Sequence, residues 1–139
     1  MTLQIYTARI STRDPDRFDI TRGSGGVAGA PFAPSNDILQ PALRDRERAR
    51  KLFKLGRVAE ACQLENALWE RYTPLYLAEM RGSYVRHREA WDALLARPRV
   101  VLTCYCAAWP GQPLHCHRVL LAERCLVPCG AVYFGELAA

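Results

Sequence analysis

The stretch VVLTCYCAAWPGQPLHCHRVLLAERCL at residues 100–126 decides how the rest of the chain is interpreted. It opens with an apolar, β-branched run that is too short for a helix, which is typical of a buried central strand. A turn-forming stretch containing Pro and Gly follows, and residues 114–126 then have helical spacing. A strand followed by a helix is the repeating unit of an α/β domain.

Three more strands are predicted outside this segment. LQIYTARI at residues 3–10 and a short run at residues 18–21 come first, and the Gly-rich loop GSGGVAGAP follows them. AVYFGEL, at residues 131–137, is predicted as the last strand.

Helical segments fill the middle of the chain. Ser35 is suited to cap a first helix that Gly56 would end. A second helix covers residues 57–72, and Pro74 then occupies the first turn of a third helix. That third helix is expected to carry His87 on an apolar stripe, as a hydrogen-bonded core histidine.

This order of elements predicts one compact three-layer α/β domain over residues 1–139, with a mainly parallel sheet and flanking helices. The strand at residues 100–105 should be central, because its apolar character requires both of its faces to be covered. A chain of 139 residues is long enough for one well-packed core and too short for two ordinary domains.

The sequence predicts a cytoplasmic protein without a membrane segment. No apolar run is long enough to span a bilayer, and residues 1–20 lack the basic-then-apolar layout of a secretory signal. In a reducing compartment, six cysteines are better interpreted as thiols or metal ligands than as a disulfide framework.

The formal charge of +5 comes almost entirely from arginine, since Lys51 and Lys54 are the only lysines among 19 basic residues. The planar guanidinium suits phosphate and nucleic acid. In RDRERAR and RHRE, however, arginine alternates with acidic residues, as on solvated helix faces. The charge favours a phosphate-bearing partner without identifying it.

The cysteines and histidines of residues 100–126 are compatible with a zinc site. Its ligands would be Cys104, Cys106, Cys116 and either His115 or His117, because thiolate and imidazole in tetrahedral array suit zinc. The C-x-C spacing of Cys104 and Cys106 is tighter than the usual spacing of structural zinc ligands. We therefore predict no resident metal or other cofactor and keep zinc as an alternative.

The same segment is also compatible with an anion site. Cys116, His117 and Arg118 open the predicted helix, where unpaired backbone N–H groups stabilise anions and lower the pKa of a cysteine. Cys116 would then be a reactive thiol. The simplest alternative is that the cysteines are small buried side chains, which we prefer for Cys62 and Cys125.

Two motifs resemble the DUF488 family, a bacterial and phage family of domains of unknown function. They are DITR in FDITRGSG and CHR after an apolar strand, and the resemblance spans nearly the whole chain. It implies a compact three-layer α/β fold with a site between the DITR loop and the start of the CHR helix. The implied site residues are Asp19, Arg22, Ser24, Cys116, His117 and Arg118.

The predicted function is that of a small α/β protein that binds or acts on a nucleotide or another phosphate-bearing ligand. Arg22 and Arg118 would hold the anion, and Cys116 and His117 would be the catalytic residues of an enzyme. Whether the chain is an enzyme stays open. The alternative is a phage-type protein without catalytic activity that binds nucleic acid or a host protein through its arginine-rich surface.

Overall fold

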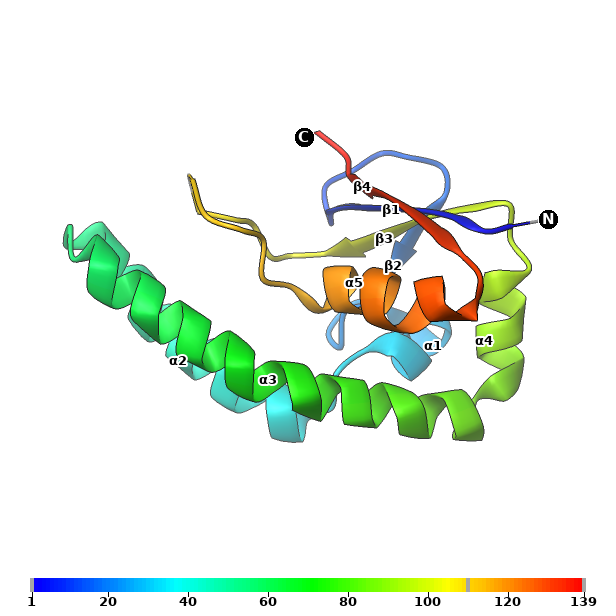
Figure 1. Cartoon of the computed structure of the whole chain (residues 1–139), viewed down its shortest axis with the longest axis horizontal. Helices are drawn as coiled ribbons and strands as arrows, with labels where there is room; N and C mark the ends of the chain where they lie inside the picture. The colour runs from blue at the N-terminus through cyan, green and yellow to red at the C-terminus, as the bar shows by residue number, and fades with distance from the viewer. Residues whose placement is uncertain (1, 110, 139) are drawn as a thin grey trace.

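A computed structural model describes residues 2–109 and 111–138 of the chain. In this part of the chain, four strands form one parallel sheet (Figure 1). Their order across the sheet is β2 (Arg17–Asp19), β3 (Arg99–Cys104), β1 (Gln4–Arg9) and β4 (Val132–Glu136). The α/β fold with a parallel sheet is confirmed, and β3 is an inner strand as predicted.

Both faces of β3 are covered. Val100 and Leu102 belong to the main hydrophobic core, whereas Val101 and Thr103 are fully buried on the opposite face. On that second face Arg99 lies over the Tyr6 ring and pairs with Asp14 and Asp16 of the loop between β1 and β2. The apolar run of β3 is therefore buried on both sides, which is the constraint that places it inside the sheet.

The domain has three layers in Figure 1: the sheet, a short helical layer and a long helix. The middle layer is α5 (His117–Leu120), which continues with π-helical hydrogen bonding (η2, Leu121–Leu126) and a short turn (η3, Val127–Cys129). The long helix α3 (Val58–Arg86) lies beneath it. None of the helices in the described residues combines the length and apolarity that a bilayer crossing requires.

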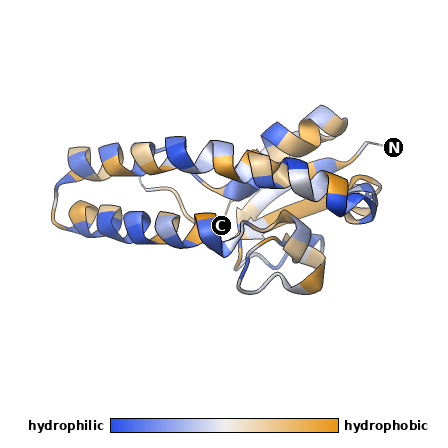
Figure 2. Cartoon of the chain, turned by 90° about the horizontal axis from the view of Figure 1, so that it is seen from below, coloured by the Kyte–Doolittle hydropathy of each residue, from blue (hydrophilic) through white to orange (hydrophobic). Residues whose placement is uncertain are grey.

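Helices α2 (Asn36–Lys54) and α3 run side by side as a hairpin (Figure 2). Ser35 stands at the predicted cap position of α2, but its hydroxyl donates to the Glu79 carboxylate of α3. Glu79 also accepts the Ser35 backbone N–H, at 2.8 Å. The start of α2 is therefore joined to the carboxyl-terminal third of α3.

The predicted helix break at Thr73 and Pro74 is wrong, because α3 runs through Pro74 without interruption. Proline lacks the N–H that would continue the helical ladder. The carbonyl that loses its helical donor is that of Glu70, whereas the Thr73 hydroxyl donates to the neighbouring Trp69 carbonyl, at 2.8 Å. Tyr72 and Tyr76 on either side of Pro74 are buried, so tertiary packing offsets the lost hydrogen bond.

The prediction that His87 lies in the core is also wrong. Helix α3 ends at Arg86, and α4 (Arg88–Leu95) begins after a change of backbone direction at His87. The predicted apolar stripe is thereby divided between two helices. Trp91 of α4 is buried, whereas His87 between the helices is exposed.

The Gly-rich loop after β2 packs against the strand's own backbone. It contains α1 (Gly26–Gly29) and the turn η1 (Ala30–Phe32). A Cβ atom at Gly29 would lie 2.1 Å from the Asp19 carbonyl oxygen, and one at Gly25 would lie 2.7 Å from it. No side chain fits at either position, so the loop requires glycine there.

We expect Gly29→Ala to lower the free energy of unfolding by about 2 kcal/mol or more, because backbone atoms must move to relieve the contact. Gly23→Ala is the matched control, since a Cβ at Gly23 meets nothing within 4 Å. The control should stay within about 0.5 kcal/mol of wild type in urea unfolding. Equal stability of the two variants would contradict the close approach.

Candidate functional site

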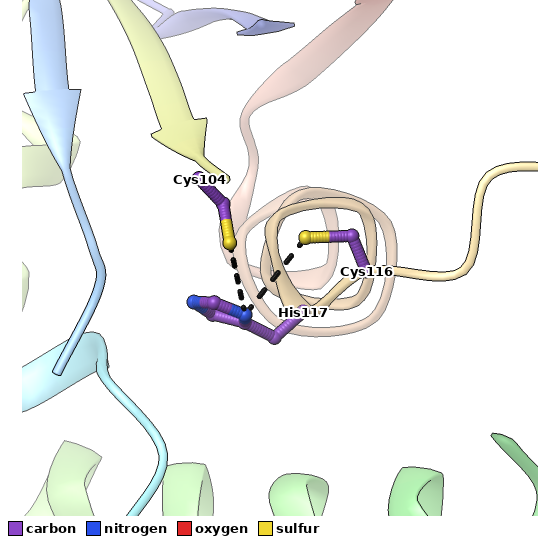
Figure 3. A group of neighbouring side chains, drawn as sticks. All are labelled: Cys104, Cys116 and His117. Atoms are coloured by element: carbon purple, nitrogen blue, oxygen red, sulfur yellow. Dashed lines mark hydrogen bonds between the residues drawn. The ribbon is translucent and has the colours of Figure 1, made fainter. Parts of the chain in front are cut away.

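Two cysteines and one histidine meet where β3 ends and α5 begins (Figure 3). Cys104 is the last residue of β3, Cys116 directly precedes α5, and His117 is the first residue of α5. The two Sγ atoms and the histidine Nδ1 all lie within 4.8 Å of one another, and all three residues are buried. The thiol cluster consists of these three residues and Cys106, whose Sγ lies 3.9 Å from that of Cys104.

The spacing within the thiol cluster is close to that of a tetrahedral metal site. His117 Nδ1 lies 3.7 Å from Cys104 Sγ and 3.9 Å from Cys116 Sγ. Zinc bonds to sulfur and nitrogen would place such donors about 3.8 Å apart for two sulfurs and about 3.6 Å for sulfur and nitrogen. Cys104, Cys116 and His117 could therefore hold a metal ion, whereas Cys106 lies near Cys104 but outside the group of donors that are all within 4.8 Å of one another.

The orientation of the His117 ring is set by Ile20, the residue directly after β2. Its Nε2 lies 2.9 Å from the Ile20 carbonyl oxygen, which only accepts, so Nε2 carries the proton. In the neutral ring Nδ1 then presents its lone pair to the sulfurs. A carbonyl oxygen that accepts from the far ring nitrogen is what fixes the tautomer of metal-binding histidines.

The cluster favours one thiolate. Hydrogen bonds from Cys106 and Cys116 lower the pKa of the Cys104 thiol well below its usual range. Burial raises the pKa of the Cys116 thiol. The hydrogen bond between Cys106 and Cys104 raises the pKa of the Cys106 thiol. The hydrogen bonds within the cluster therefore favour ionisation of Cys104 over that of Cys106 and Cys116.

Arg118 is fully buried, and its donors are used inside the protein. Its Nε and Nη2 donate to the two carboxylate oxygens of Glu136, at 3.1 and 2.7 Å. Its Nη1 donates to the Cys106 carbonyl at 2.9 Å and lies 3.3 Å from Cys116 Sγ. Arg118 thus ties β4 to the thiol cluster.

A second guanidinium, which the sequence analysis missed, reaches the cluster from α2. Arg46 Nη1 lies 2.9 Å from Cys106 Sγ, and Nη2 lies 3.2 Å from Glu65. The sequence pattern marked RDRERAR as a solvated face, and only the hairpin packing turns Arg46 inward. Arg46 and Arg118 together place positive charge beside two of the sulfurs.

His115 is not grouped with the sulfurs, although the predicted zinc ligands included it. Its ring stacks on Trp69 with centroids 5.0 Å apart, and its Nδ1 lies 3.9 Å from Glu65 Oε1. Burial lowers the pKa of His115, so the ring is neutral at pH 7. The structure brings His117 to the cluster in its place.

The DITR segment does meet the CHR segment, through the Ile20 carbonyl and His117. The Asp19 carboxylate accepts from the Thr21 hydroxyl at 2.6 Å and from the Ser24 hydroxyl at 2.5 Å. Burial raises the pKa of Asp19, but these hydrogen bonds outweigh it and the pKa is lowered. Asp19 and Ser24 therefore hold the loop in shape.

Arg22 also has protein acceptors. Its Nε donates to the Pro34 carbonyl at 2.8 Å and its Nη2 to the Ala33 carbonyl at 3.3 Å. Both arginines of the site implied by the resemblance are thus engaged with the protein.

Several arginines outside that site form ion pairs with carboxylates. Arg48 and Arg71 pair with Asp45, Arg57 with Glu60, and Arg88 with Asp92.

Comparison with known proteins finds no matching family model, no matching curated protein and no matching solved structure. The resemblance to the DUF488 family therefore stays a prediction that rests on the two sequence motifs.

We expect Arg118→Ala to destabilise the fold by about 2–4 kcal/mol, because it leaves a cavity and removes several hydrogen bonds. Arg124→Ala, an exposed change on the same helical stretch, is the control and should cost less than about 0.5 kcal/mol. Thermal and urea unfolding would measure both. An Arg118→Ala variant as stable as the control would mean that the buried guanidinium contributes nothing to folding.

Proposed function

We propose that this chain is a zinc-binding α/β protein, with Cys104, Cys116 and His117 as metal ligands and Cys106 as the fourth. The observation that carries the proposal is the convergence of three buried donor atoms within 4.8 Å from two separate segments. The chain thus brings together, before any metal binds, the kind of donor set that structural zinc sites use.

The donor types select the metal class. Thiolate sulfur and imidazole nitrogen suit zinc, whereas carboxylate and water suit magnesium or calcium. The C-x-C spacing of Cys104 and Cys106, which argued against zinc, is retained in this ligand set, and Cys116 and His117 are adjacent in the sequence. The two pairs come from the end of a strand and the start of a helix, and the fold brings three of the four donors within 4.8 Å of one another.

The environment is that of a closed, structural site. Cys104, Cys116 and His117 are all less than one tenth exposed. Two guanidinium groups lie beside the sulfurs of Cys106 and Cys116, and would offset the net negative charge of three thiolates around one divalent ion. Zinc held there would join β3, the start of α5 and, through His117, the end of β2.

Metal content tests the proposal directly. Chain purified under reducing conditions without chelators should carry about one zinc per molecule by native mass spectrometry. Cys104→Ser and Cys116→Ser should lose most of it. Cys125→Ser is the matched control, because burial raises the pKa of that thiol to about 11 and it lies outside the cluster. Wild-type protein that takes up no zinc on reconstitution would overturn the proposal.

Removal of the metal should lower the melting temperature, because zinc binds the folded site and not the unfolded chain. At free zinc about a thousand times the dissociation constant, the stabilisation is about 4 kcal/mol. Calorimetry with and without a chelator would measure the shift, and added zinc should restore it. An unchanged melting temperature after complete metal removal would exclude a structural role.

A further inference from the structure

A basic cleft of about 370 Å³ lies at the carboxyl edge of the sheet, beside the thiol cluster. Its walls come from the end of β1, from α2 and from the connection that follows β3. The side chains that matter are Arg9, Arg46, Arg50, Tyr105 and Trp109. The carboxyl ends of parallel strands are where open α/β sheets bind their ligands.

The cleft has uncompensated positive charge. Three arginines line it against one acidic residue, Glu47. Within residues 2–109 and 111–138, the side chain of Arg9 makes no ion pair and no hydrogen bond. Arg50 pairs only with Glu47, and this exposed pair is of the weak kind that an anion can displace. Two guanidinium groups are therefore available to a ligand.

The cleft also has an aromatic wall. Tyr105 is 58% exposed, yet its hydroxyl lies 3.0 Å from Ser24 Oγ, so the ring is held in position. The Trp109 ring stacks on Phe53 of α2 with centroids 5.0 Å apart. An exposed ring fixed beside two arginines suits a ligand with both a flat ring and a phosphate.

We propose that this cleft binds a nucleoside phosphate of mononucleotide size, with Arg9 and Arg50 on the phosphate and Tyr105 against the base. The volume lies within the range of small-molecule sites. Arg48, Arg57 and Arg71, which lie outside the cleft, are each paired with a carboxylate. Arg22 and Arg118, the arginines expected from the sequence to hold the phosphate, take no part.

The probe is AMP, titrated by calorimetry into the protein as purified, with adenosine and inorganic phosphate as partial ligands. Arg9→Gln and Arg50→Gln should each weaken AMP binding about tenfold to a hundredfold. Arg57→Gln is the matched control, an exposed arginine paired with Glu60 outside the cleft, and should bind AMP as wild type does. Tyr105→Leu should weaken AMP binding and leave binding of inorganic phosphate unchanged. Tyr105→Phe keeps the ring but loses the hydrogen bond to Ser24, and should weaken AMP binding less than Tyr105→Leu does.

Three outcomes would overturn the proposal. They are no AMP binding at millimolar concentration, equal losses in the Arg9, Arg50 and Arg57 variants, or affinity for single-stranded oligonucleotides that rises with length and exceeds that for AMP. The last result would indicate a nucleic-acid partner. Zinc content is measured on the same samples, so loss of the metal and loss of AMP binding are told apart.

Discussion

The carboxyl edge of the sheet is organised around one buried cation, the guanidinium of Arg118. A charge without solvent contact must be compensated by the protein, and Glu136 on β4 supplies both carboxylate oxygens. The remaining donor reaches the Cys106 carbonyl and the Cys116 sulfur. One side chain therefore sets the distance between the last strand, the connection after β3 and the thiol cluster, so the cluster is assembled by the fold itself.

The sheet was predictable because its information is local. The β-branched runs of β1 and β3 identify strands, and the apolar character of both faces of β3 identifies an inner strand. The path of α3 was not predictable in the same way. Pro74 is a valid stop signal in an isolated segment, and only the buried neighbours Tyr72 and Tyr76 show why the helix continues.

The sequence predicted which segments contain the candidate site, but not which side chains meet there. The clustering of cysteine and histidine at the end of β3 and the start of α5 identified the region, and strand-then-helix geometry identified its place at the sheet edge. The choice between His115 and His117 depends on the Ile20 carbonyl, and the inward turn of Arg46 depends on the α2–α3 packing. Both are tertiary contacts that no local pattern contains.

The fastening of Ser35 to Glu79 bears on the order in which the hairpin folds. Ser35 and Glu79 are 44 positions apart in the sequence. At the tip of the hairpin, around Gly56, the residues of α2 and α3 that face each other are close in sequence. Since the entropy cost of loop closure grows with separation, we expect contacts near the tip to form first. The ion pair of Arg71 with Asp45, 26 positions apart, would follow. The hairpin is then expected to close from its tip, with the contact at the start of α2 forming last.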